Sequence, residues 1–399
     1  MIYIHIPFCR SFCTYCDFYS EVAAKCRNAR DREAEQMLWK NFSEAVCEEI
    51  RERRTEMTDE VNTLYIGGGT PSVLPPSVFG TLLKALQEAG HGGPFDEFTV
   101  EVNPEDIVEK GHGYVEELLE LGVNRVSMGV QSFDDGILRW MNRRHDSATA
   151  RRAYSILEEA GVSDISIDLI FGMPQLSDAL WDETLEKALT ISPNGNLPKH
   201  ISAYQLSVEP GSALAGMAGK GLWTEASQED CARQYSVLCA TLAEAGYHHY
   251  EISNFALPGH EALHNSAYWD HRPYLGLGPA AHSYMDCPLD GKTHGEGRSS
   301  VRQWNSPDLE SYIEAARSGN FAKVRECEVL DGDQLALEHI MLALRTSEGI
   351  SAAYLREHAD QKALSRAFED GRLITLPSGN VRIPESFFFI SDSVISAIV

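Results

Sequence analysis

The residues with the clearest chemical potential are three cysteines near the start of the chain, Cys9, Cys13 and Cys16, in the segment FCRSFCTYCDF. Three thiolates close together, without histidines at the spacing of a zinc site, suit iron better than zinc. An iron-sulfur cube ordinarily takes four thiolates, one for each iron. Three thiolates leave one iron open to another ligand. The spacing therefore predicts a 4Fe-4S cluster with an open iron; a zinc site with a distant fourth ligand is the alternative.

The elements that must position these cysteines are short β-rich runs that alternate with helical patterns from residue 1 to about residue 285. Six runs read as strands: MIYIHIP, NTLYIG, FTVEVN, NRVSMGVQ, DISIDLIFG and HISAYQLSV. HHYEISNF is a possible seventh. This alternation is typical of repeated β/α units around a parallel sheet. It predicts an α/β barrel over residues 1–285, and an antiparallel sheet with one wet face is the alternative.

Apolar and polar residues alternate along the expected strands. In FTVEVN the residues at 98, 100 and 102 are apolar and share one face, whereas Thr99 and Glu101 share the other. A closed barrel normally fills its lumen with branched apolar side chains. A polar inner face instead predicts a ligand cavity, lined by Tyr3, Glu101, Gln131 and Asp168.

The remainder of the chain has a different pattern. Residues 286–328 are richer in Gly, Asp and Ser and are expected to form a connector. Residues 329–399 show helical patterns at 331–345, 351–358 and 361–370, followed by the hairpin RLITLPSGNVRI. Three helices and a wing predict a small winged-helix-like domain. In an acidic chain its expected role is to cover the barrel mouth or dock a partner.

Composition excludes some classes of function. The formal net charge of −25 argues against a nucleic-acid surface. No window reaches the ~20 apolar residues of a membrane span, which predicts a cytoplasmic protein without an integral membrane segment and leaves peripheral membrane association open. Nine cysteines are too few and too odd in number for a disulfide framework. The single cysteines expected to be small buried hydrophobes are Cys47, Cys231, Cys239, Cys287 and Cys327, and Cys26 is unassigned.

With the predicted barrel, the C-x3-C-x2-C spacing resembles that of the radical S-adenosylmethionine (SAM) superfamily. The resemblance implies a partial, open β/α barrel and SAM as a second cofactor. In that superfamily the amino and carboxylate groups of SAM chelate the open iron. Reduction of the cluster then cleaves the sulfonium to a 5′-deoxyadenosyl radical.

Longer segments resemble one branch of this superfamily, the HemN/HemW branch. This resemblance covers nearly the whole chain. They are YIHIPFCRSFCTYCDF, YIGGGTPS, VEVNPE, NRVSMGVQSFDDGILRWMNRRH, SIDLIFGMPQ and HISAYQLSVEPGS. The HemN coproporphyrinogen dehydrogenases have a cysteine motif that resembles C-x3-C-x2-C-x-C, and they have a longer N-terminal region. This chain has Phe18 at the position of the extra thiol, and its first cysteine is residue 9. In these two respects the chain resembles the HemW family, whose members are regarded as heme chaperones. Two further segments also resemble that family: HNSAYW at 264–269 and YLGLGPAAHSY at 274–284.

The resemblance also implies roles for individual residues. The candidates for SAM binding are Tyr3, Tyr15, Gly68, Gly69, Thr70, Glu101, Gln131, Arg143, Asp168 and Ser207. The glycine-rich turn would approach the methionine moiety, and Glu101 suits the SAM ammonium or the ribose hydroxyls. Arg143 offers a fork for the SAM carboxylate. His264 in HNSAYW is a candidate heme ligand, and a histidine bonded only within the fold is the alternative.

The implied function is that of a heme chaperone, which carries one cluster with SAM at its open iron and passes heme to an acceptor protein that the sequence does not identify. The alternative is a radical enzyme that acts on a tetrapyrrole by decarboxylation, methyl transfer or ring opening. Phe18 argues against coproporphyrinogen dehydrogenase activity. No catalytic residue is assigned from the sequence.

Overall fold

The frame of the molecule is one nine-stranded sheet in the order β11-β1-β4-β5-β6-β7-β8-β10-β9. The computed structural model describes residues 1–22, 29–57, 60–286 and 300–399. The strands are β1 (Ile2–Ile6), β4 (Thr63–Gly68), β5 (Glu97–Val102), β6 (Arg125–Gln131), β7 (Asp164–Phe171), β8 (His200–Gln205), β9 (His248–Glu251), β10 (Asn254–Ala256) and β11 (Leu275–Leu277). From β11 to β8 all neighbours are parallel, and β10 pairs antiparallel with both β8 and β9. The two edge strands do not pair with each other, so the predicted open β/α barrel is confirmed.

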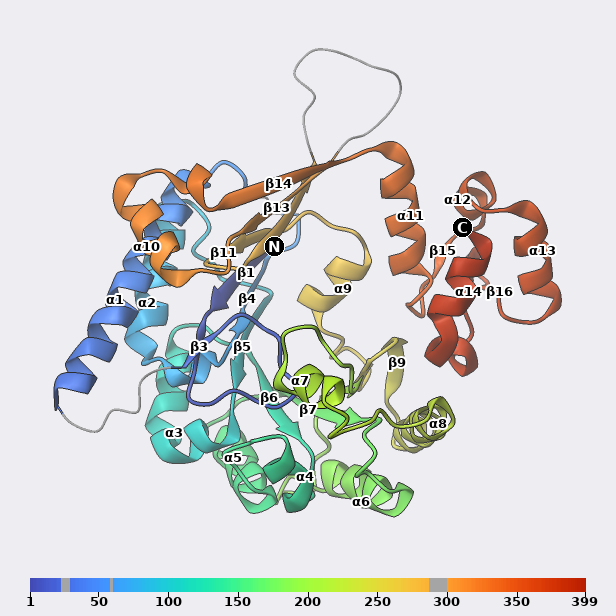
Figure 1. Ribbon diagram of the computed structural model, residues 1–399, viewed down its shortest axis with the longest axis horizontal. Helices are drawn as coiled ribbons and strands as arrows, with labels where there is room; N and C mark the ends of the chain where they lie inside the picture. The colour runs from blue at the N-terminus through green and yellow to red at the C-terminus, as the bar shows by residue number, and fades with distance from the viewer. Residues whose placement is uncertain (23–28, 58–59, 287–299) are drawn as a thin grey trace, which may run out of the picture.

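Helices cover the outer face of this sheet, in an arc that runs from α1 at the left of Figure 1 to α8 at the right. They are α1 (Ala29–Glu52), α2 (Pro76–Glu88), α3 (Pro104–Glu120), α4 (Asp135–Trp140), α5 (Ser147–Glu159), α6 (Asp178–Leu189) and α8 (Gln228–Glu244). Asp134, Asp146, Ser177 and Ser227 each accept a hydrogen bond from a backbone N–H three residues later. These side chains satisfy otherwise unpaired donors and define where four of the helices begin.

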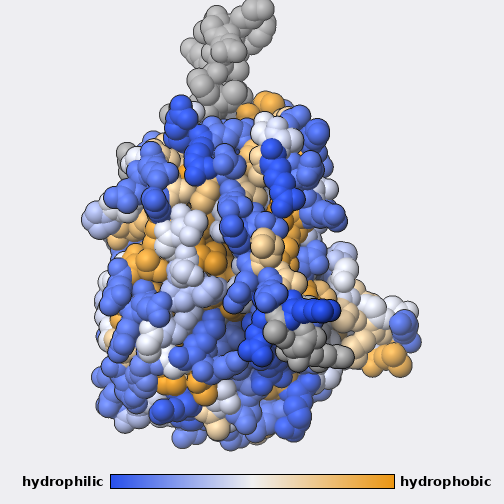
Figure 2. All heavy atoms as spheres, turned by 90° about the vertical axis from the view of Figure 1, so that its left-hand side faces the viewer, coloured by the Kyte–Doolittle hydropathy of each residue, from blue (hydrophilic) through white to orange (hydrophobic). Residues whose placement is uncertain are grey.

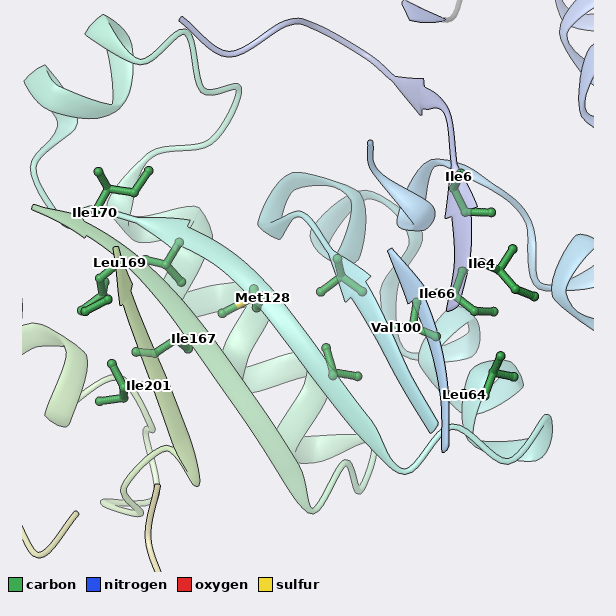
Figure 3. Packing of buried hydrophobic residues seen from close by; sticks show 14 of the residues in the cluster. Ile4, Ile6, Leu64, Ile66, Val100, Met128, Ile167, Leu169, Ile170 and Ile201 are labelled. Atoms are coloured by element: carbon green, nitrogen blue, oxygen red, sulfur yellow. The ribbon is translucent and has the colours of Figure 1, made fainter. Parts of the chain in front are cut away.

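The core lies between the sheet and these helices, and Figure 3 shows apolar side chains from successive strands gathered there. Ile4, Ile66, Val100, Met128 and Ile167 are completely buried. Full burial of one such side chain contributes about 1.5–3 kcal/mol relative to leaving it in water. Every second residue of each strand supplies this layer, as the alternation in the sequence predicts.

The outer surface carries the polar residues. The side of the molecule on which α1, α2 and α10 (Leu309–Ser318) lie is mostly hydrophilic, with scattered apolar residues (Figure 2). Among the described helices, none is long and apolar enough to cross a membrane.

Two features of the main sheet differ from the sequence prediction. HHYEISNF is not one strand but two, because the chain reverses at residues 252–253 between β9 and β10. The buried Glu251 carboxylate accepts hydrogen bonds from the Ser253 backbone and the Asn254 side chain and thereby holds this turn. The three-residue strand β11 was not expected, since it is too short to show a periodic pattern.

The rest of the chain forms two smaller sheets. Residues 300–330, which include most of the expected connector 286–328, contain β13 (Ser300–Asn305), α10 and β14 (Arg325–Leu330). Together with β12 (His282–Asp286), these strands form a sheet in the order β12-β13-β14. Farther on lie α11 (Gly332–Ala343), α12 (Ala352–His358), α13 (Gln361–Glu369), α14 (Ser391–Ile398) and the sheet of β15 (Ile350–Ser351), β16 (Ile374–Thr375) and β17 (Asn380–Arg382). These last elements lie together at the right of Figure 1.

The single cysteines do not all lie in the core. Cys47 and Cys231 are buried, as expected, and Cys239 is half-buried. The expectation is wrong for Cys327, which is exposed because β14 is an edge strand with an open face. Cys26 and Cys287 lie outside the described residues.

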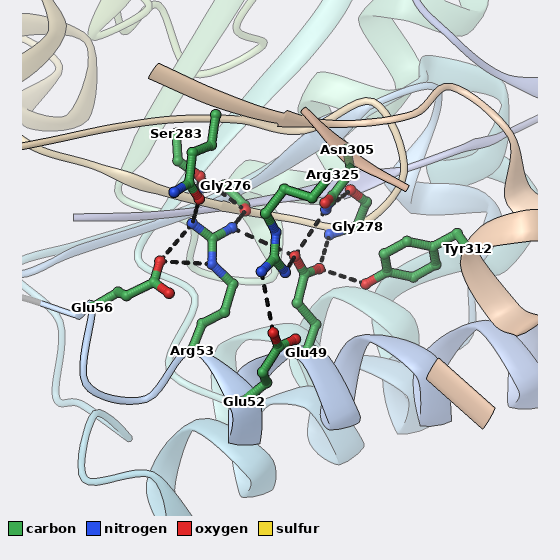
Figure 4. Close-up of polar contacts among 11 residues, drawn as sticks. Glu49, Glu52, Arg53, Glu56, Gly276, Gly278, Ser283, Asn305, Tyr312 and Arg325 are labelled. Atoms are coloured by element: carbon green, nitrogen blue, oxygen red, sulfur yellow. Dashed lines mark hydrogen bonds and ion pairs between the residues drawn. The ribbon is translucent and has the colours of Figure 1, made fainter. Parts of the chain in front are cut away.

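A buried carboxylate on α1 ties the N-terminal helix to the segments near residues 276–325 (Figure 4). The Glu49 side chain is fully buried and accepts hydrogen bonds from the Gly278 backbone at 2.9 Å and from the Tyr312 hydroxyl at 2.6 Å. Asn305 and Arg325 donate to the same carboxylate at 2.8 and 3.1 Å. A buried charge is tolerated only when it is bonded in this way, so the network fixes these elements against one another.

Replacing Glu49 by Gln should lower the free energy of unfolding by about 3 kcal/mol, because the Arg325 charge loses its buried partner. Urea denaturation of the cluster-free protein measures the loss. Glu52→Gln is the matched control, since Glu52 is half-exposed and contacts the same arginine at 3.2 Å. Its cost should stay below about 1 kcal/mol. Equal losses in the two variants would contradict a special role for the buried carboxylate.

Candidate functional site

A cavity of about 730 Å³ occupies the inner face of the sheet. Every residue that the sequence predicts for cluster, SAM or heme binding contributes to its wall: Cys9, Cys13, Cys16, Tyr3, Tyr15, Gly68, Gly69, Thr70, Glu101, Gln131, Arg143, Asp168, Ser207 and His264. These residues come from positions 3 to 264 and are brought together by the parallel strands. The polar face of the strands therefore lines a cavity, as the alternation predicts.

The loop with the three cysteines is held on one side by the glycine-rich turn after β4. The backbone N–H of Gly69 donates to the Ile6 carbonyl at 2.8 Å, and that of Thr70 donates to the Phe8 carbonyl at 2.8 Å. The Thr70 hydroxyl lies 3.4 Å from the Cys9 sulfur. The first cysteine and the turn therefore form one rigid corner of the cavity.

On its other side, the cysteine loop is held by the segment after α4. The Thr14 backbone N–H donates to the Met141 carbonyl at 3.0 Å, and the Thr14 hydroxyl donates to the Trp140 carbonyl at 2.8 Å. The Asn142 amide donates to the Phe12 carbonyl at 2.7 Å. Because several bonds fix the backbone, the positions of Cys13 and Cys16 follow from the fold.

The three thiols suit a metal cluster rather than catalysis as free nucleophiles. Burial raises the pKa of Cys9 and raises that of Cys16 to about 12, so both favour the neutral thiol until a cation arrives. In the described part of the chain, no three His, Cys, Asp or Glu side chains converge closely enough to hold one metal ion. The thiolates of a cubic cluster bind different irons, so their spacing is not that of a single-ion site.

The turn after β4 needs glycine for reasons of space. Gly68 has φ +112°, and a Cβ there would lie 2.5 Å from the His5 ring. At Gly69 a Cβ would lie 2.8 Å from the Phe8 carbonyl oxygen. His5 itself is bonded to the Tyr3 hydroxyl and the Tyr19 carbonyl, which fits a structural histidine. Glycine therefore allows the turn to pack closely against β1 and Phe8 while Gly68 and Gly69 line the cavity.

Glu101 supplies a carboxylate beside this turn. The Tyr65 hydroxyl donates to one of its oxygens at 2.7 Å, and the Gly68 backbone N–H donates to the other at 3.0 Å. Burial raises the pKa of Glu101 to about 7, although these two hydrogen bonds favour the charged form. A cation bound beside the carboxylate would restore its ionised form.

Asp168 and Gln131 face the same space from β7 and β6. The Ser127 hydroxyl lies 3.2 Å from both Asp168 carboxylate oxygens. Burial raises the pKa of Asp168 to about 6, although the hydrogen bond from Ser202 favours the charged carboxylate. Gln131 has φ +67° where the β6–β7 register shifts, an irregularity that interrupts the regular alternation at the strand end.

Arg143 places a cation beside Cys13 in this wall. Its Nη2 donates to Asn103 at 2.6 Å and to the Gly129 carbonyl at 2.8 Å, and its Nη1 lies 3.5 Å from the Cys13 sulfur. Its buried Nε has no hydrogen-bond partner among the described residues. A buried guanidinium nitrogen without a partner fits a site for an anionic group of a ligand.

His264 lies at the opposite end of the cavity, in the helix α9 (Leu263–Trp269) formed by the HNSAYW motif. Its Nδ1 is 2.8 Å from the Thr63 hydroxyl and its Nε2 is 3.2 Å from the Tyr268 hydroxyl. Burial lowers the pKa of His264 to about 3. These contacts match the alternative interpretation, a histidine bonded within the fold. Its role as a heme ligand stays a prediction that requires the Tyr268 contact to break.

Several residues of the cavity wall were not singled out from the sequence. They are Tyr65, Thr99, Asn103, Arg125, Ser127, Ser166, His200, Ser202 and Tyr204. The alternation places Thr99, Asn103 and Ser127 on the polar face with the predicted residues, but it assigned none of them a ligand. Ser207 is exposed, and its hydroxyl donates to Glu209 at 2.6 Å.

Comparison with known proteins agrees with this geometry. The radical SAM superfamily model matches residues 3–188. The chain is 35% identical to the heme chaperone HemW of Synechocystis sp., with 88% of this chain and 79% of that protein covered. It is 32% identical to HemW of Lactococcus lactis, covering 87% and 82%. The structure of coproporphyrinogen III oxidase HemN from Escherichia coli superposes with a TM-score of 0.75, over 99% of this chain and 89% of that one, at 21% identity, which concerns the fold alone.

The raised pKa of Glu101 predicts a pH-dependent stability. The folded protein holds a proton that the unfolded chain releases, so this contribution is full below the unfolded pKa and is lost as the pH rises through about 7. Glu101→Gln removes the titration. The variant should therefore gain about 2–3 kcal/mol of unfolding free energy relative to the wild type between about pH 5 and pH 8.

Urea unfolding of the cluster-free proteins at both pH values measures this difference. Glu116→Gln, on the exposed face of α3, is the matched control and should show no such trend. A constant difference between wild type and Glu101→Gln across the range would show that the carboxylate is not desolvated in the folded state.

Proposed function

The chain belongs to the HemW family of the radical SAM superfamily, and on that premise we propose that it is a heme chaperone that binds one 4Fe-4S cluster, SAM and heme and passes heme to an acceptor protein. The observation that carries the proposal is the convergence of the three-cysteine loop, the glycine-rich turn and the polar strand face on one cavity. The acceptor and a cytoplasmic location stay predictions.

Cys9, Cys13 and Cys16 would hold three irons of the cluster. A bound cluster supplies an electron and an open iron to which SAM can bind. Thr70 can donate its hydroxyl hydrogen to the Cys9 thiolate. Arg143, 3.5 Å from the Cys13 sulfur, places a positive charge beside the negatively charged thiolates.

The remaining residues would orient SAM. Glu101 and the backbone of the glycine-rich turn suit its ammonium, and the unpartnered side of Arg143 suits its carboxylate. Gln131 and Asp168, farther along the lumen, suit the ribose hydroxyls. A cavity of about 730 Å³ lies in the range that encloses one drug-sized ligand.

The heme part of the proposal is supported by membership of a family whose curated members are named heme chaperones. An anaerobic assay with SAM, reductant and heme tests it. Recovery of unaltered heme on an apo-acceptor supports the chaperone. Chemical conversion of an added porphyrinogen or of the heme itself would instead support the radical enzyme.

Replacing Cys9, Cys13 or Cys16 by Ala should abolish the cluster, because two thiolates do not hold three irons of a cube. Iron and sulfide analysis after anaerobic reconstitution measures how much cluster each variant holds. Cys47→Ala is the matched control, since Cys47 is a buried thiol on α1 that does not line the cavity. A full complement of iron in Cys13→Ala would refute the ligand assignment.

Asp168→Ala and Gln131→Ala should leave the cluster intact and weaken SAM binding by about 1–3 kcal/mol each, because each loses hydrogen bonds in a partly dry site. Calorimetric titration of the reconstituted protein with SAM measures the change. The control is Gln36→Ala on the exposed surface of α1. Unchanged affinity in both cavity variants would mean that SAM does not contact this part of the lumen.

A further inference from the structure

The exposed residues of the cavity wall all lie at one end of it. Among the described residues that line it, the exposed ones are Phe12, Asp17, Phe18, Asn142, Arg144, Tyr204, Gln205 and Ser207. All of them lie at or beyond the C-terminal ends of the strands. At the other end, around α9, Arg125, His200, Tyr250 and His264 are buried. A ligand therefore enters beside the cysteine loop.

Two phenylalanines at this mouth are unusually exposed. Phe12 lies between Cys9 and Cys13 and is 55% exposed, and Phe18 lies two residues after Cys16 and is 67% exposed. In the part of the chain that the structure describes, one other phenylalanine is exposed, Phe368 on α13 at 37%. Two bare aromatic rings beside an opening mark a surface that an apolar ligand can cover.

The volume of the cavity indicates that the lumen and this surface would bind different ligands. The lumen accommodates one ligand of drug size, and by the proposed function that ligand is SAM. Heme is larger than SAM and does not fit beside it in the same volume. When SAM is bound, heme must therefore bind at the mouth or elsewhere on the surface.

The mouth also offers a suitable charge and a fixed backbone. The Phe12 carbonyl accepts a hydrogen bond from the Asn142 amide at 2.7 Å, which places the backbone of Phe12 beside the segment that carries Arg144. Arg144 is exposed, and its contacts with Glu105 and Asp106 are long, at 3.7 Å. A flat apolar macrocycle with carboxylates on its edge matches two aromatic rings next to an accessible guanidinium.

Resting on the proposed function, we propose that Phe12 and Phe18 form an apolar rim that binds one face of the porphyrin of heme, with Arg144 placed for a propionate. The rim holds the macrocycle through its ring and not through its iron. Heme on the rim has its iron at the open end of the cavity, whereas His264 lies at the closed end. Binding at the rim and axial ligation by His264 are therefore competing assignments.

The test is a titration of the anaerobically reconstituted, SAM-bound protein with heme and, separately, with metal-free protoporphyrin IX. The wild type should bind both, because stacking does not require iron. The double variant Phe12→Ser/Phe18→Ser should bind both about tenfold more weakly or worse. Phe12→Trp/Phe18→Trp should retain binding, and Phe368→Ser is the matched control with unchanged affinity. Iron content and SAM affinity of each variant establish that the cysteine loop is still folded.

The outcomes separate the two proposals. A wild type that binds neither heme nor protoporphyrin overturns the proposed function itself. Unchanged affinity in the double serine variant overturns the rim alone, as does heme binding that is lost in His264→Ala and kept in that double variant. A double variant that binds heme normally and fails only to deliver it would show that the rim contacts the acceptor protein, which also overturns the proposal.

Discussion

The whole molecule depends on the fact that successive side chains of a β-strand point to opposite faces of the sheet. In six of the parallel strands, β1 and β4 to β8, one set of residues packs against helices and the other set lines a polar cavity. Polar groups on the inner face must find partners, because an unpaired one buried from water is costly. Tyr65 bonds Glu101, Ser127 bonds Asp168, and Ser166 contacts His200, so the cavity wall is held in place before any ligand binds.

The same alternation explains how much could be predicted from the sequence. It identified the apolar face and the polar face, because each is visible within a single strand, and the succession of strands and helices along the chain predicted the parallel sheet. Pairing between short distant segments left no local signal, so β11 was missed, and the reversal inside HHYEISNF depends on the buried Glu251. The motif HNSAYW did not reveal that both ring nitrogens of His264 have hydrogen-bond partners within the protein. One partner, Thr63, lies two hundred residues away in the chain and is brought close only by the fold.

The two ends of the cavity differ in character, and this difference organises the site. The end near α9 is closed and lined by buried polar side chains, whereas the end near the cysteines is open and flanked by exposed aromatic rings. A small polar cofactor is favoured in the interior, where fixed donors and acceptors replace water. A large apolar molecule is favoured at the entrance, where it covers rings that would otherwise face solvent. The cysteine loop lies between these two environments.

The position of β1 in the sheet has a consequence for biosynthesis. Residues Ile2–Ile4 pair with β11 at Leu275–Leu277, and Glu49 on α1 bonds groups as distant as Arg325. At the usual pace of about 5–20 residues per second, a ribosome needs roughly 13–54 s to reach β11 after it has made β1. During that time one side of β1 is an unpaired edge, open to association with other nascent chains. The strand next to the cysteine loop is thus synthesised long before its partner β11, and efficient production of this protein should depend on protection of β1 until the ribosome has made that partner.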